Sequence, residues 1–129
     1  MESKPDRPCP FCRMDSRKIL AEQGCMFAVT DTSPVTLHHV LIIPRRHCTD
    51  YFDLTERELC DARLLVEELK RGIMEKDPRV EGFNIGVNCG EAAGQTVFHA
   101  HIHLIPRRRS DTPEPRGGVR GVIPDRMGY

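Results

Sequence analysis

Three histidines lie at every second position in the apolar segment VFHAHIHLI, residues 97–105. His99, His101 and His103 are half of the six histidines in the chain. Alternate side chains of a β-strand project from one face, so this spacing predicts a row of imidazoles backed by an apolar row. A neutral imidazole has a free lone pair that can attack phosphorus, accept a proton or bind a metal ion.

Three interpretations of this row are open. The histidines are polar residues on a solvated strand face, or they bind a metal such as zinc, as a His-x-His pair can. In the third interpretation, one imidazole attacks phosphorus while its neighbours donate a proton and bind phosphate. Such a nucleophile needs its other ring nitrogen hydrogen-bonded to fix the tautomer, and a backbone carbonyl near His99 is a candidate partner.

Two cysteines near the N-terminus, Cys9 and Cys12 in CPFC, supply half of a tetrahedral zinc site. A thioredoxin-like redox pair follows a strand, and the charged, proline-rich residues 1–8 leave no room for one. The remaining alternative is a pair of unligated thiols. Two further ligands from elsewhere in the chain would favour the zinc site over unligated thiols.

The hydrophobic pattern indicates the elements that position these residues. Two strands with a tight turn at Gln23-Gly24 are predicted within 17–31, and further strands over 37–44, 82–88 and 97–106. Thr55 and Glu58 form a capping box at the start of a helix that ends before Asp77-Pro78. The order of elements predicts an α+β domain with an antiparallel sheet of about five strands.

A glycine-containing loop, CGEAAGQT, joins the last two predicted strands. Gly90 and Gly94 allow backbone N–H groups to turn toward an anion, and Gln95 and Thr96 add polar side chains just before the histidines. The sequence therefore predicts a phosphate cradle beside the imidazole row.

Composition limits the classes of protein that the chain can represent. A length of 129 residues predicts one domain, 1–129, with a flexible lead over 1–8 and an irregular basic tail over 107–129. Nineteen basic residues balance nineteen acidic ones, which gives no overall electrostatic case for nucleic acid. The absence of an apolar leader or a membrane span predicts a cytoplasmic protein with reduced cysteines and no membrane partner.

The run NCGEAAGQTVFHAHIHLIPR, residues 88–107, resembles the signature of the histidine-triad (HIT) superfamily, with GQTV as the usual lead-in. TLHHVLIIPRRH, residues 36–47, is similar to an earlier block of that family, in which a histidine precedes a strand that ends in Ile-Pro-basic-basic-His. Asp31, eight residues before His39, also fits. His38 is adjacent, and the alignment selects His39. The resemblance covers residues 9–107 and implies a HIT-like domain with one main helix.

The resemblance also implies an activity, namely nucleotide hydrolysis at the α-phosphate through a covalent nucleotidyl-histidine intermediate. His101 would attack phosphorus, and His103 would bind phosphate oxygens and assist the leaving group. The implied substrate-binding residues are Asp31 for the ribose hydroxyls, His39 behind the triad and, for phosphate, Asn88, Gln95, Thr96 and Val97.

Zinc-carrying members of the superfamily suggest the two missing ligands of the CPFC pair. In the galactose-1-phosphate uridylyltransferase branch, among others, an N-terminal CxxC joins a histidine of the middle block and the first triad histidine. In this sequence the set would be Cys9, Cys12, His47 and His99, a closed and therefore structural Zn²⁺ site. Cys48, beside His47, is a substitute ligand.

The superfamily contains dinucleoside polyphosphate hydrolases, purine nucleoside phosphoramidases and nucleotidyl transferases. The tail after HLIPRRRSD resembles that of the diadenosine-polyphosphate-hydrolase-like group, and we favour a dinucleoside polyphosphate such as diadenosine tetraphosphate. Five tail arginines either neutralise polyphosphate or form a solvated basic face: Arg107, Arg108, Arg109, Arg116 and Arg120.

A homodimer is usual in the family, and the helix over 55–75 is a candidate contributor to its interface. Outside the enzymes, a non-catalytic nucleotide-binding adaptor is the alternative.

Overall fold

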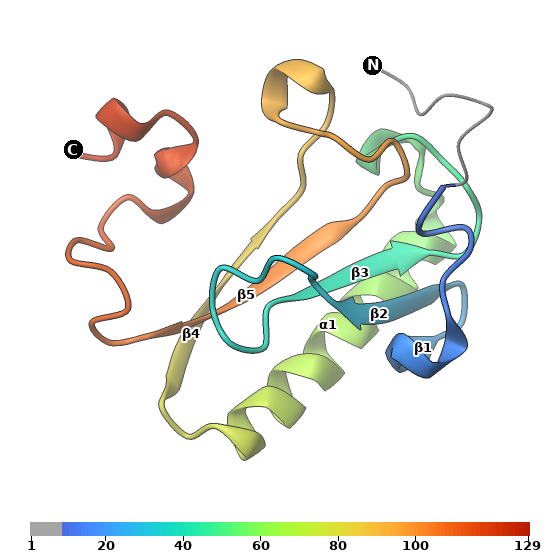
Figure 1. Ribbon diagram of the computed structural model, residues 1–129, viewed down its shortest axis with the longest axis horizontal. Coiled ribbons are helices and arrows are strands. Elements are labelled where there is room, and N and C mark those ends of the chain that lie inside the picture. Colours follow the sequence, from blue (N-terminus) through green and yellow to red (C-terminus); the bar gives the residue numbers. More distant parts are fainter. Residues whose placement is uncertain (1–8) are drawn as a thin grey trace.

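A computed structural model describes residues 9–129, and the lead predicted over 1–8 lies outside the described residues. One five-stranded antiparallel sheet and one long helix, α1 (Glu56–Lys76), make up the body of the molecule (Figure 1). The predicted fold class, an antiparallel α+β domain with about five strands and one main helix, is confirmed.

The sheet has the order β1-β2-β3-β5-β4, so β1 and β4 are its edges. The first hairpin forms where it was predicted, and its turn includes Gly24 in the left-handed region with φ of 53°. The strands, in chain order, are β1 (Ile19–Gln23), β2 (Met26–Thr30), β3 (Val40–Pro44), β4 (Val80–Gly86) and β5 (Ile102–Arg108).

The start of α1 is fixed by the predicted capping box. The Thr55 side chain accepts a hydrogen bond from Glu58 N at 3.0 Å, and Glu58 Oε1 accepts one from Thr55 N at 2.9 Å. The Glu58 carboxylate is buried and also accepts from Arg46 Nη2 at 2.9 Å. These bonds satisfy backbone donors that the first helical turn leaves without intrahelical partners.

The two faces of the sheet bury different sets of side chains. On one face, Met26, Ile42 and Leu104 pack with Leu65 and Ile73 of α1. On the other face, Phe27, Val29, Leu41 and Ile43 pack against Phe11 and Met14 of the N-terminal segment and Ile19 of β1. Because successive strand residues point to opposite faces, one apolar run such as VLII supplies both layers.

Two predicted strands begin later than expected, and both differences involve histidines. β3 starts at Val40, because His38 lies in the left-handed region with φ of 73° and turns the chain just before the strand. β5 starts at Ile102, so His99 and His101 precede it. The chain here bonds outside the sheet, with Ala100 N donating to Cys48 O at 2.8 Å.

The C-terminal tail is irregular, as predicted, but it begins later because Arg107 and Arg108 belong to β5. It contains two short 3₁₀ turns, Gly118–Val122 and Pro124–Arg126. No helix within residues 9–129 is both long and apolar enough to cross a membrane.

Gly24 is the position at which a single methyl group should disturb this fold most clearly. A Cβ there would lie 2.4 Å from Asp61 Oδ2, whose carboxylate accepts a hydrogen bond from Cys25 N. We expect Gly24→Ala to lower the free energy of unfolding by about 2 kcal/mol, through backbone strain and loss of this contact.

Gly72→Ala is the matched control for urea denaturation. A Cβ at this helical position would meet nothing within 4 Å, and the change should stabilise the protein by about 0.5–1 kcal/mol. Equal effects of the two substitutions would contradict this account of the turn.

Candidate active site

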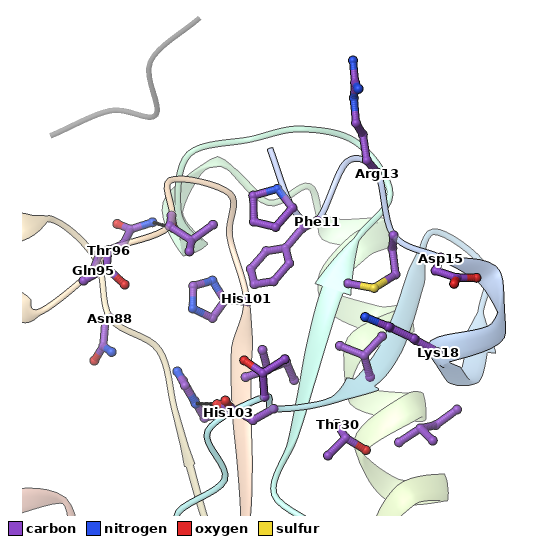
Figure 2. A pocket seen from close by; sticks show the side chains of 18 of the residues that line it. Phe11, Arg13, Asp15, Lys18, Thr30, Asn88, Gln95, Thr96, His101 and His103 are labelled. Carbon is purple, nitrogen blue, oxygen red and sulfur yellow. Dashed lines mark hydrogen bonds and ion pairs between the residues drawn. The ribbon is translucent and has the colours of Figure 1, made fainter. Parts of the chain in front are cut away.

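A pocket of about 830 Å³ opens on the face of the sheet opposite α1. Seven of the residues predicted to act on or bind a substrate line it: Asp31, Asn88, Gln95, Thr96, Val97, His101 and His103. His39, the eighth, is buried directly behind His103, with 2.9 Å between His39 Nε2 and His103 Nδ1. The four predicted metal ligands form a separate cluster. Figure 2 shows several of the pocket side chains converging from β5, the preceding loop and the N-terminal segment.

His101 is held by the backbone of its own segment. Its Nδ1 lies 2.8 Å from the carbonyl oxygen of His99. A carbonyl can only accept, so Nδ1 carries the proton, and in the neutral ring the Nε2 lone pair is free. The imidazole borders the pocket and has the tautomer that a nucleophile requires.

His103 has the opposite tautomer, and the reason lies in the loop before β3. The Val35 N–H donates to His39 Nδ1 at 3.1 Å, so the proton of neutral His39 is on Nε2. That proton points at His103 Nδ1, 2.9 Å away. His103 Nδ1 is therefore an acceptor, and neutral His103 carries its proton on Nε2. Two neighbouring rings, with centroids 5.3 Å apart, thus combine one bare nitrogen and one N–H donor.

Burial keeps His39 and His103 neutral. It is the largest cause that lowers the pKa of His39, and the charge of Asp31 opposes it. Burial also lowers the pKa of His103, assisted by His101 and His39.

Asp31 Oδ2 lies 3.4 Å from His39 Nε2, and Asp31 Oδ1 accepts from Ser33 N at 2.8 Å. Asp31 is therefore well fixed at the edge of the pocket.

Gln95 lines the pocket, and its side-chain amide is bound to backbone groups. Its side chain is buried, Oε1 accepts from Gly90 N at 2.8 Å, and Nε2 donates to Thr49 O and Val97 O at 2.7 and 3.1 Å. Both amide protons are used by backbone partners, so this side chain positions the loop. Phosphate binding by Gln95 stays a prediction, and Thr96 beside it is exposed at the pocket.

The predicted metal ligands meet beside the pocket. Cys12 Sγ lies 3.1 Å from His47 Nδ1, and His99 Nδ1 lies 3.2 Å from His47 Nδ1, 3.4 Å from Cys9 Sγ and 3.5 Å from Cys12 Sγ. Tetrahedral zinc with ordinary bond lengths needs N–N and N–S separations of about 3.3–3.6 Å. His99 Nε2 donates to Pro44 O at 2.8 Å, which leaves the Nδ1 lone pair for a metal. The donor set and spacing fit Zn²⁺.

Asp31, His39 and His103 also lie close enough together to hold a metal. The hydrogen bonds argue against that interpretation. A metal on His39 Nε2 would move the proton to Nδ1, where it would face the donating N–H of Val35. The group is better described as a hydrogen-bonded chain that orients His103.

Sequence reasoning treated CPFC as two cysteines and missed Phe11 between them. The Phe11 ring lies edge-on to both His99 and His101, at centroid distances of 5.7 and 5.1 Å. Met14 and Lys18 of the same segment also line the pocket. The sequence signal that could have revealed this wall is the presence of two apolar residues, Phe11 and Met14, in an otherwise polar N-terminal segment.

The basic tail does not reach the pocket. Arg107 pairs with Asp111 and Arg108 with Asp77, at 2.8 and 3.0 Å. Arg109 pairs with Glu81, and the guanidinium groups of Arg116 and Arg120 lie over the ring of Tyr129. None of the five lines the pocket, so the neutralisation of polyphosphate by these arginines is not supported.

Comparison with known proteins identifies the family. The family model of the HIT domain matches residues 13–110, and the chain belongs to this family. An uncharacterised HIT-like protein of Mycobacterium tuberculosis is 33% identical over 81% of this chain and 74% of its own length. The bis(5′-nucleosyl)-tetraphosphatase (asymmetrical) of Schizosaccharomyces pombe is 39% identical over 67% of this chain, which spans 47% of that enzyme.

Solved structures agree with this assignment. A HIT family protein from Bacillus anthracis is 37% identical, with a TM-score of 0.72 over 80% of this chain and 75% of that one. A zinc-bound histidine triad family protein from Mycobacterium smegmatis is 32% identical, with a TM-score of 0.73 over 82% of this chain and 79% of that one.

The lowered pKa values of His39 and His103 predict a dependence of stability on pH. Both histidines have pKa values below 6.5 when folded, so the unfolded chain binds more protons below about that pH. The free energy of unfolding should therefore fall as the pH is lowered from 7.5 to 5.5. In His39→Gln, which lacks one of the two groups, the slope should be shallower.

Urea denaturation of both proteins at several pH values measures the two slopes. The remaining titratable groups are common to both proteins, so the difference in slope reports His39 and its effect on His103. Identical slopes would contradict the assignment of these histidines as neutral groups.

Proposed function

We propose that this chain is a nucleotide hydrolase that acts at an α-phosphate through a covalent intermediate on His101. The observation that carries the proposal is the 2.8 Å hydrogen bond between His101 Nδ1 and the His99 carbonyl, which leaves Nε2 unprotonated beside the pocket. Few arrangements other than nucleophilic attack use an imidazole fixed in this way next to a second imidazole with the opposite tautomer.

The reaction has two steps in this proposal. His101 Nε2 attacks the α-phosphorus, a P–N bond forms, and the P–O bond to the leaving phosphate breaks with its electron pair. His103 Nε2–H donates a hydrogen bond to an oxygen of the reacting phosphate. Water then attacks the same phosphorus and releases a proton to solvent, the P–N bond breaks with its electron pair returning to Nε2, and a nucleoside monophosphate leaves with His101 neutral again. Thr96 and Asn88 border the phosphate end of the pocket.

Dinucleoside polyphosphates are the favoured substrate class. The names of two relatives support this choice, the S. pombe tetraphosphatase and a bis(5′-adenosyl)-triphosphatase of Dictyostelium discoideum that is 36% identical over 66% of this chain and 56% of that enzyme. A phosphoramidase or nucleotidyl transferase would use the same nucleophile and differ only in the leaving or accepting group. A cytoplasmic location remains our expectation for such an enzyme.

We assign Cys9, Cys12, His47 and His99 to one structural Zn²⁺. When bound, the ion links the N-terminal segment to the residues before β5, and with four protein ligands it has no open position for a substrate. The zinc-bound relative from M. smegmatis supports the assignment. Cys48, the predicted substitute, lies outside this cluster of ligand atoms and is buried.

A homodimer belongs to the same proposal. β4 is an edge strand, and an apolar groove beside it is lined by Val66 and Met74 of α1 together with Phe83 and Ile85. Ile85 is 52% exposed, which is unusual for a large aliphatic side chain in a strand. A second copy that covers this groove would also pair or protect the strand edge.

A substrate panel tests the proposed reaction. Purified protein should release nucleoside monophosphate from diadenosine tetraphosphate faster than from an adenosine phosphoramidate or a nucleotide sugar. His101→Ala should lose at least about 10³-fold in kcat, because the covalent route is removed. If none of the three substrates turns over at micromolar enzyme while AMP binds, the hydrolase proposal fails and the adaptor alternative is favoured.

Elemental analysis of the same variants separates the roles of the first two triad histidines. His101→Ala should keep about one zinc per chain, whereas His99→Ala should lose it, because the closed site needs all four ligands. Retained zinc in His99→Ala and lost zinc in His101→Ala would mean that the two roles are exchanged.

The dimer is tested by light scattering on the purified protein. Ile85→Asp places a charge in the proposed interface and should shift the species from dimer to monomer, because a buried unpaired charge is costly. Leu20→Asp is the control, since Leu20 is 55% exposed on the opposite edge strand, β1. A monomeric parent protein would contradict the proposal.

A further inference from the structure

The pocket extends beyond the histidines into an apolar region. Phe11, Met14, Val29 and Leu41 line this part, on the side of the N-terminal segment. Polar groups gather at the other end, where His101, His103 and Thr96 lie (Figure 2). We place phosphate at the histidines, as proposed above, and ribose near Asp31, as the family resemblance implies. A nucleotide base would then occupy the apolar region, because flat rings pack well between apolar side chains.

One cation projects into this apolar region. Lys18 ends the short 3₁₀ turn Ser16–Lys18, directly before β1, and Figure 2 shows its side chain directed toward the pocket. No carboxylate among residues 9–129 forms an ion pair with it. A lysine ammonium is a donor without acceptor capacity, so it favours a ligand that presents oxygen or bare nitrogen at this point.

The two other basic residues of the pocket wall do not compete for this role. Arg17 and Lys18 are both exposed, but Arg17 is bound to Asp15 at 2.9 Å, whereas Lys18 has no ion pair within residues 9–129. The side chain of Arg13 extends away from the pocket in Figure 2. Lys18 is therefore the basic residue of this segment that a bound base would meet.

We propose that Lys18 makes the pocket select 6-oxopurine nucleotides, such as guanine nucleotides, over adenine nucleotides. Guanine and hypoxanthine present two neighbouring acceptors, O6 and N7, to one donor. Adenine presents N7 beside an amino group, which is itself a donor and repels the ammonium. The base preference thus follows from the ammonium charge of Lys18 beside the apolar region of the pocket.

The inference rests on the proposed function only for the location of the base, so it is tested by binding without turnover. Isothermal titration calorimetry with GMP, IMP and AMP should give affinities for GMP and IMP roughly tenfold above that for AMP, the ratio expected for one charge-assisted hydrogen bond. IMP lacks the 2-amino group of GMP, so equal binding of the two assigns the preference to the O6 and N7 edge.

Lys18→Met keeps the length and apolar stem of the side chain and removes the charge. It should abolish the preference by weakening GMP and IMP while leaving AMP within about twofold. Arg17→Met is the matched control and should retain the full preference. An equal loss for all three nucleotides in Lys18→Met, or no preference in the parent protein, would overturn the inference. Base-selective binding without hydrolysis of any substrate would overturn the proposed function and leave this inference intact.

Discussion

The hydrogen bond from His101 to the carbonyl of its neighbour His99 is the interaction on which the site depends. It forms just before the chain joins the sheet at Ile102, one residue after the imidazole. The His99 carbonyl precedes β5 and accepts from the His101 ring, which fixes the tautomer of that ring. The carbonyl just before β5 thus does for His101 what a carboxylate does for the histidines of many active sites, without adding a charge.

The same principle distinguishes the remaining histidines. The Pro44 carbonyl accepts a hydrogen bond from Nε2 of His99, which leaves Nδ1 facing the thiols. The Val35 amide donates to Nδ1 of His39, so the Nε2–H of His39 donates to His103. Backbone groups are fixed by the fold, so each imidazole has one role for as long as the sheet and its loops are intact. Burial, which lowers the pKa of His99 and of His103, keeps the rings neutral and makes these tautomers persist.

The sequence was sufficient for the α+β class and the capping box of α1, because periodicity and spacing are local properties of the chain. The grouping of residues around the triad followed instead from the resemblance to the HIT superfamily. The sequence was insufficient for the start of β5, since period-two spacing cannot show whether a carbonyl bonds to another strand or to a side chain. The hydrogen bonds from Gln95 to Thr49 and from Arg108 to Asp77 were equally hidden. Each joins residues that are far apart in the chain, and such contacts leave no mark in a single sequence.

Phe11 gives the N-terminal segment a double use. Cys9 and Cys12 flank it in the proposed metal site, while its ring and the side chain of Met14 form a wall of the pocket. A metal held by the thiols and a ligand held against Phe11 therefore order the same few residues. Whichever binds first meets most of the entropic cost, and the second binds to a segment already in place. By thermodynamic reciprocity, a filled pocket must retain its metal more tightly by the same factor by which the metal tightens the pocket.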